Sequence, residues 1–114
     1  MAGMIVLSDL ASATNTDVLQ GTRLQTVPRG GFLTFELQSN DSDASNYFTV
    51  SIQMPNGDTP LNTVRVPTGN ADGEIDDRKK LMVTLPVAQG GHAVFSIAET
   101  GTALLAWRVT YSPV

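Results

Sequence analysis

Few side chains in this chain are able to do acid–base or nucleophilic chemistry: it has one histidine and no cysteine in 114 residues. His92 is the sole candidate for an imidazole general base, and a Ser-His-Asp triad would need partners that only the fold brings together. The nucleophile elbow Gly-x-Ser-x-Gly does not occur in the sequence. The segment Gly90-Gly91-His92 is typical of a turn that leads into a strand. We therefore expect no catalytic residue and no enzyme.

A second candidate site is the acidic segment Gly69-Asn70-Ala71-Asp72-Gly73-Glu74-Ile75-Asp76-Asp77, which superficially resembles a calcium-binding loop. When its central glycine takes the sixth position of an EF-hand loop, the first position is Thr68 and the twelfth is Lys79. The strongest carboxylate ligands are then missing, which excludes an EF-hand. A calcium site of another kind, shared with Asp41 and Asp43, stays open as an alternative to a solvated loop.

Paired carboxylates are the chemistry of glycoside hydrolysis, which needs two acids about 5–9.5 Å apart in a cleft. Asp76 and Asp77 are neighbours in the sequence, but nothing in the pattern places them in a cleft. We expect no metal, no cofactor and no cofactor-binding residue.

The charge of the chain argues against nucleic acid as a direct partner. The net charge is −4 and the isoelectric point is about 4.6, whereas nucleic-acid binders usually present a basic surface. The one basic run, Arg78-Lys79-Lys80, is typical of a loop entering a strand, with a phosphate contact as the alternative. Charged residues make up 16% of the chain, below the usual quarter, which hints at surface committed to other protein.

The hydropathy pattern predicts no membrane segment. No apolar run approaches the roughly 18 residues of a membrane span. The start, Met1 to Leu7, has no basic region and too short an apolar stretch for a signal peptide. We therefore expect a soluble protein made in the cytoplasm of some cell.

Short segments of alternating apolar and polar residues dominate the chain. Such a period of two describes a strand with one buried face. Turns rich in Gly, Pro, Asn and Asp separate the segments. We predict strands at residues 4–7, 22–27, 32–39, 47–54, 63–66, 80–87, 93–97 and 104–111. Seven to eight short strands predict an all-β fold: a single-domain antiparallel β-sandwich that is jelly-roll-like.

The alternation also predicts which side chains fill the core. Each inward row lies on one face of its strand, because neighbouring side chains point to opposite faces. The predicted core is Leu33, Phe35, Leu37, Phe48, Val50, Ile52, Leu81, Val83, Leu85, Phe95, Ile97, Leu105, Trp107 and Val109.

The first 21 residues differ from the rest of the chain. One apolar run, Met4-Ile5-Val6-Leu7, is followed by a polar stretch without a clean period. We interpret residues 1–21 as an N-terminal strand and extended arm, and residues 22–114 as the sandwich domain. The apolar run either closes the sheet of its own domain or adds a strand to a neighbouring copy, and the low charge favours the neighbour.

The alternation places two aromatic side chains on the outward face, Phe32 and Tyr47. Together with Met4, Ile5, Val6 and Leu7 they are the candidate subunit contacts. The simpler interpretation is that each ring packs on the opposite face of its sheet or is covered by a loop.

Four segments spread over most of the chain carry a resemblance to a known group of proteins: Asn15 to Thr22, Pro55 to Leu61, Gly90-Gly91-His92 and the closing Trp107-Arg108-Val109-Thr110-Tyr111. With these segments the chain resembles the small β-rich virion proteins of environmental tailed phages and related viruses. The resemblance implies a non-enzymatic, self-assembling structural protein located in the virion, either a capsid subunit or a capsid-decoration subunit. Its partners would be copies of itself, as a homo-oligomer, and a major capsid protein. The alternative is a β-sandwich module that binds a ligand or carbohydrate.

Overall fold

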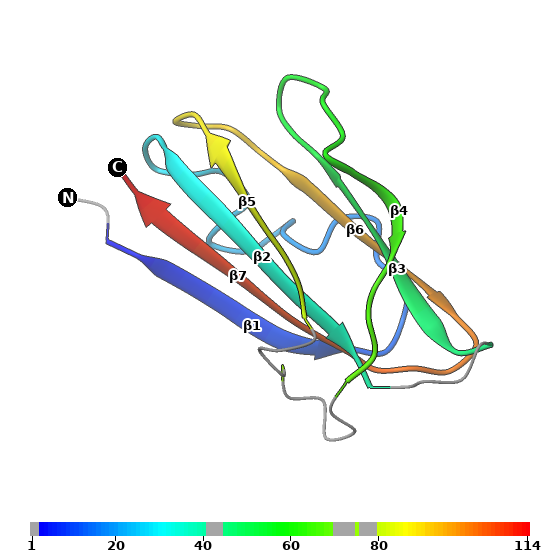
Figure 1. Ribbon diagram of the computed structural model, residues 1–114. Coiled ribbons are helices and arrows are strands. Elements are labelled where there is room, and N and C mark those ends of the chain that lie inside the picture. Colours follow the sequence, from blue (N-terminus) through cyan, green and yellow to red (C-terminus); the bar gives the residue numbers. More distant parts are fainter. Residues whose placement is uncertain (1–2, 41–44, 70–74, 76–79) are drawn as a thin grey trace.

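Alternating apolar and polar residues form seven of the eight strands that the sequence predicts, whereas the predicted strand at residues 22–27 forms turns. The computed structural model describes residues 3–40, 45–69, 75 and 80–114 (Figure 1). Within these residues the secondary structure consists of strands and turns, with no helix. The strands are β1 (Ile5–Ala11), β2 (Gly31–Ser39), β3 (Tyr47–Gln53), β4 (Leu61–Arg65), β5 (Leu81–Val87), β6 (Val94–Thr100) and β7 (Leu105–Pro113).

The strands form two antiparallel sheets that pack into a sandwich. Sheet A has the order β1-β7-β2-β5, and sheet B has the order β4-β3-β6. The first and last strands are therefore neighbours in sheet A, and Figure 1 shows the start of β1 and the end of β7 at the same end of the molecule. No helix long and apolar enough to cross a membrane occurs in the described part of the chain.

A short segment beside β6 completes the jelly-roll-like arrangement. Asn15 exchanges two backbone hydrogen bonds of 2.9 Å with Ile97, and the Val18 N–H donates to the carbonyl of Phe95 at 2.7 Å. Residues 14–18 thus lie along sheet B in the place of a further strand. Each sheet then has four members, and the chain passes repeatedly from one sheet to the other, as a double-sheet jelly roll does.

The core lies between the two sheets and contains the inward rows that the alternation predicts. Eleven of the fourteen predicted core residues are buried, and three aromatic rings join the sheets there. Phe35 and Phe95 meet edge to face with centroids 5.3 Å apart, and Phe95 meets Trp107 in the same way at 5.9 Å. Edge-to-face pairs add stability beyond the area that they bury.

The three remaining predicted core residues, Leu81, Val83 and Leu85, are half-buried. They face the core from β5, which is the last strand of sheet A and has a neighbour on one side only within the described chain. A side chain on such a strand lacks cover from one flank, which is why alternation alone overestimated their burial.

Residues 12–30 supply buried side chains that the alternation missed. Leu19 and Leu24 are 0% exposed, and Val18 and Val27 join them in the core. Further core residues outside the predicted set are Val66, Val87, Ala93, Ala103 and Tyr111.

Of the two alternatives that the sequence left open for the N-terminal apolar run, the structure shows the one in which the run closes the sheet of its own domain. Ile5–Leu7 pair with Val109–Tyr111 of the same chain, and the following polar stretch is fastened to β6. The physical reason is that β7 has two hydrogen-bonding edges, of which β2 fills only one.

The two strands β2 and β5 offer a matched test of this burial. Leu37 and Leu81 are opposite each other in the ladder, yet Leu37 is fully buried and Leu81 is half-buried. We expect Leu37→Ala to lower the free energy of unfolding by about 2–5 kcal/mol, and Leu81→Ala to cost less than half as much. Urea denaturation of both variants measures the difference, and equal losses would contradict the assigned edge position of β5.

Candidate functional site

The outer face of sheet A, which points away from the core, is built from rows of side chains on four strands. The registers align Val6, Thr110, Thr34 and Thr84 in one row. The next row contains Ser8, Arg108, Glu36 and Met82. Because side chains on a strand alternate between faces, these rows lie opposite the buried rows.

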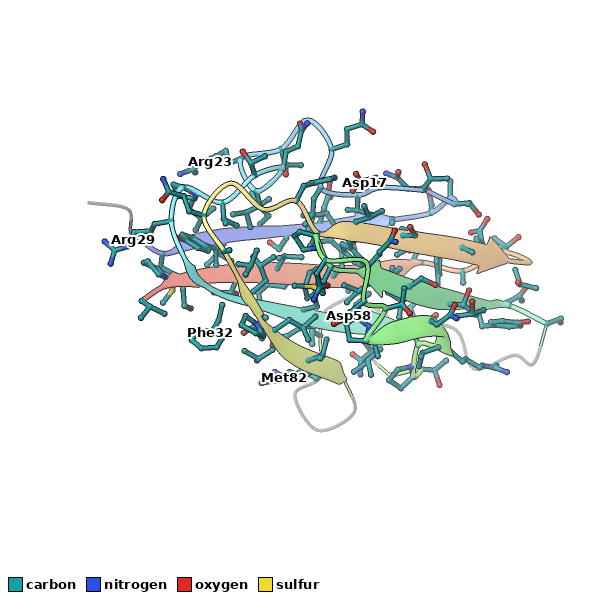
Figure 2. All side chains as sticks on the ribbon, turned by 90° about the horizontal axis from the view of Figure 1, so that it is seen from above. Asp17, Arg23, Arg29, Phe32, Asp58 and Met82 are labelled. Carbon is teal, nitrogen blue, oxygen red and sulfur yellow. The ribbon has the colours of Figure 1, made fainter. Side chains whose placement is uncertain are left out.

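Large apolar side chains lie exposed along two margins of this face. On the β1 margin, Met4 is 66%, Val6 is 51% and Leu10 is 49% exposed. On the β2–β5 side, Phe32 is 42% and Met82 is 56% exposed. Figure 2 shows Phe32 and Met82 on one side of the molecule, opposite Asp17 and Arg23. Five of the seven exposed large apolar side chains of the described chain thus lie on this face or, for Met4, directly before the strand at its margin.

The centre of the face is polar and internally paired. Glu36 is 7% exposed and accepts hydrogen bonds from Arg108 Nε at 2.9 Å and Arg108 Nη2 at 2.7 Å. The Lys80 amine also donates to this carboxylate. In the neighbouring row, the hydroxyls of Thr34 and Thr84 are 3.0 Å apart and hydrogen-bonded.

These cations determine the protonation of the carboxylate. The Arg108 hydrogen bonds, opposed by burial and reinforced by Lys80, lower the pKa of Glu36 from 4.5 to about 2. Glu36 is therefore ionised at all ordinary pH values. Its hydrogen bonds with Arg108 and Lys80 are charge-assisted and hold the polar centre together.

One end of the outer face is covered by the chain segment that follows β4. The Ser39 N–H donates to the Pro67 carbonyl at 2.9 Å, and the Gly69 N–H donates to the Ser39 carbonyl at 2.8 Å. Gln38 lies against Gly69 so closely that a Cβ there would be 2.0 Å from its amide nitrogen. Gln38 at this end is consequently buried, whereas Phe32, Val6 and Met82 remain exposed.

The candidate subunit contacts predicted from the sequence divide among three surroundings. Met4, Val6 and Phe32 are exposed on the outer face of sheet A, whereas Ile5 and Leu7 pack against the core. Tyr47 lies on sheet B, where the Arg65 guanidinium lies 4.3 Å from its ring centroid.

Sequence reasoning missed two members of the outer face, Leu10 and Met82. Met82 alternates with the inward Leu81 and Val83, so its outward position was available from the pattern. Leu10 lies in a stretch without a clear period, where nothing indicated that the strand continued.

A separate groove of about 630 Å³ lies between the β3–β4 turn and β5. Within the turn, the Asp58 N–H donates to Asn56 Oδ1, and Asn56 Nδ2 donates to Asp58 Oδ2, both at 3.0 Å. The other lining residues are mostly apolar and include no aromatic ring: Met54, Pro55, Thr59, Pro60, Leu85, Pro86, Val87 and Ala88.

His92 links two segments of the described chain through its ring nitrogens. Its Nε2 is 2.7 Å from Asp17 Oδ2, and its Nδ1 is hydrogen-bonded to the carbonyl of Gln25. Both ring nitrogens therefore lie within hydrogen-bonding distance of an oxygen of the same chain. The pair joins the turn before β6 to the segment that covers the sandwich edge, in keeping with the turn predicted for Gly90-Gly91-His92.

Most of the acidic segment and the basic run lie outside the described residues, as do Asp41 and Asp43. Lys80, the described member of the run Arg78-Lys79-Lys80, is hydrogen-bonded to Glu36. In the part of the chain that the structure describes, no three His, Cys, Asp or Glu side chains gather in a way that would hold a metal ion.

Comparison with known proteins adds little to this geometry. No family model and no curated protein match the chain. Among solved structures, the chain is similar to the CBM22-1 xylan-binding domain from Paenibacillus barcinonensis Xyn10C, with 11% identity and a TM-score of 0.34. That match covers 98% of this chain and 87% of the other.

The lowered pKa of Glu36 predicts a pH dependence of stability. The charged carboxylate stabilises the fold above its ordinary pKa of 4.5, and this contribution is lost as the pH falls toward about 2. We expect the free energy of unfolding of the wild type to fall by about 3 kcal/mol more than that of Glu36→Gln over this range. Denaturant titrations at several pH values measure the difference, and parallel pH curves for the two proteins would contradict the cluster.

Proposed function

We propose that the chain is a non-enzymatic structural protein that assembles with copies of itself, as a capsid or capsid-decoration subunit of a virion. The observation that carries the self-assembly is the gathering of Met4, Val6, Leu10, Phe32 and Met82 on the outer face of sheet A. Scattered apolar side chains are normal on a protein surface, but a shared face of this kind is typical of contact with another protein.

The polar centre of the face suits such a contact. Glu36 is already paired with Arg108 and Lys80 inside the chain, so covering it leaves no isolated charge. The apolar margins on either side supply the area whose removal from water drives association.

The virion setting has a separate basis. A sandwich fold hosts many functions, so this part of the proposal depends on the resemblance of the sequence to small β-rich virion proteins. A homo-oligomer of this chain, with or without a major capsid protein beneath it, is the assembly that the proposal requires.

Sedimentation velocity with the purified protein tests the self-assembly. We expect the wild type to form oligomers, and the double variant Phe32→Lys/Met82→Lys to associate at least about tenfold more weakly, because two charges then have to be buried. Leu104→Lys is the matched control, since Leu104 is also an exposed apolar residue but lies outside the strands of sheet A.

Two outcomes would contradict the proposal. A wild type that stays monomeric at every concentration would remove the self-assembly itself. Oligomers that tolerate both lysines as well as they tolerate Leu104→Lys would show that another surface makes the contact.

The groove favours a second candidate function, a β-sandwich module that binds a ligand or carbohydrate. A concave, mainly apolar wall with a carboxylate at one end has the features of a small-molecule site. Asp58 is its charged group, so a bound hydroxyl-bearing ligand would donate to that side chain.

Isothermal titration with xylohexaose and cellohexaose tests this candidate. If the groove binds such sugars, Asp58→Ala should reduce the affinity at least about tenfold, the loss of one or two hydrogen bonds to a charged group. Asp9→Ala, which removes an exposed carboxylate away from the groove, should leave the affinity unchanged. Absence of heat with both sugars would count against the carbohydrate form of the candidate.

A further inference from the structure

The hydrogen-bond register of sheet A shows which backbone groups of β1 point away from the sheet. The Val114 N–H donates to the Gly30 carbonyl at 3.2 Å, one step beyond the paired residues of the β2–β7 ladder. Along β7, residues with even numbers therefore bond β2, and those with odd numbers bond β1. In β1 the odd-numbered residues face β7, and the N–H and C=O groups of Val6, Ser8 and Leu10 face outward.

A direct observation agrees with this assignment. The Leu10 N–H donates to its neighbour's carboxylate, Asp9 Oδ1, at 2.8 Å, so it does not face the ladder. The outward N–H groups of Val6 and Ser8 have no such acceptor in the described part of the chain. Unpaired groups on an edge strand are a template for another strand.

The edge of β6 that faces away from β3 cannot accept a further strand, because another segment already bonds it. Its outward groups are bonded by residues 14–18: Ile97 through both N–H and C=O, Phe95 through its carbonyl, and Glu99 through an N–H that donates to Thr14 Oγ1 at 3.0 Å. This segment therefore takes the place of a neighbouring strand.

The edges of β4 and β5 are also poor sites for strand addition. β4 has five residues, its register with β3 shifts between Val50 and Ile52, and Thr63 within it has a φ of 53°. In β5, the same even-and-odd analysis places Pro86 among the residues that face outward. Proline has no N–H to donate, and its presence at an edge discourages further pairing.

β1 differs from the three other edges. Its seven residues pair with β7 without a shift in register, and they contain no proline, glycine, lysine or arginine. Within the described residues, no strand lies beyond it in sheet A. The devices that protect the other edges are thus missing from this one.

We propose that β1 is the assembly edge of the protein, to which a second copy adds its own β1 in antiparallel orientation, so that two sheets A become one continuous sheet. This inference rests on the proposed self-assembly and adds to the outer-face contact a second one, through the β1 edge, with another copy of the chain. An antiparallel β1–β1 pair has two-fold symmetry, which is the commonest symmetry of soluble homo-oligomers.

Charge and apolar character favour this occupant and this orientation. Asp9 is the one charged residue of β1. In an antiparallel pair centred near Val6, the two Asp9 residues are about six positions apart, roughly 20 Å, which exceeds the screening length of about 8–10 Å. A parallel pair would bring them together. The antiparallel pair also places the exposed Met4 and Val6 of both copies on one shared outer face.

A proline substitution tests the edge without altering the ladder to β7. Ser8 is exposed and its N–H faces outward, so Ser8→Pro removes an outward donor and leaves the β1–β7 hydrogen bonds in place. We expect Ser8→Pro to stay folded by circular dichroism and to associate at least about tenfold more weakly than the wild type in sedimentation velocity. Ser8→Ala, which keeps the N–H, should associate as the wild type does.

Hydrogen exchange of the wild type gives a readout that needs no variant to fold. The amides of Val6 and Ser8 should exchange more slowly at high protein concentration than in dilute solution. The Thr84 amide, which faces outward on β5, should exchange at the same rate in both.

The outcomes separate this inference from the proposed function. Oligomers that form equally well with Ser8→Pro, or Val6 and Ser8 amides that exchange at a rate independent of concentration, would overturn the β1 edge and leave self-assembly through the outer face standing. A wild type that is monomeric throughout would overturn both.

Discussion

The double ladder of β7 is the interaction on which the rest of sheet A depends. Its odd-numbered residues bond β1 and its even-numbered residues bond β2, while Leu105, Trp107, Val109 and Tyr111 fill the core from the same strand. The approach to β2 is close enough that a Cβ on Gly31 would lie 2.3 Å from the Ser112 carbonyl oxygen, so glycine is required there. Once β7 is fixed, the positions of β1, of the paired Glu36 and Arg108, and of the aromatic contact between Trp107 and Phe95 follow from its register.

The outer edge of β6 in sheet B and the outer edge of β1 in sheet A differ in how far the described chain covers them. On the β6 side, residues 14–18 satisfy the backbone, and the contacts of His92 with Asp17 and Gln25 hold the covering segment down. On the β1 side the border is left open, beside a face with exposed apolar margins. Within the described residues, the open edge of β1 and the exposed apolar margin beside it therefore lie next to each other, which is the arrangement that the proposed self-assembly requires.

Strands whose residues alternate strictly could be predicted from the sequence, whereas features that depend on contacts between residues far apart in the chain could not. Residues 32–39, 47–53 and 105–111 alternate strictly, so their inward rows were predictable from the period of two alone. Leu19 lies in a stretch without a period, and Leu24 lies in a predicted strand that forms turns instead; both are buried because bonds from β6 and its turn hold this part of the chain in place. The pairs Glu36–Arg108 and Asp17–His92 join residues far apart in the chain, so no local pattern indicated them. Of the outer face, Phe32 was predictable and Leu10 was not, because the strand that carries Leu10 is defined by β7 rather than by its own residues.

The pairing of the first strand with the last has a consequence for the timing of folding. β1 is synthesised before β7, its partner, and most of the described chain separates the two strands. At typical rates of synthesis the wait is on the order of 5–20 s, and contacts of such long sequence separation also form slowly afterwards. Throughout this interval the strand Ile5–Ala11 lacks β7, its neighbour in sheet A. Two chains growing on the same message could exchange these strands before either is finished, so the history of translation would decide whether the copies part or remain interlocked.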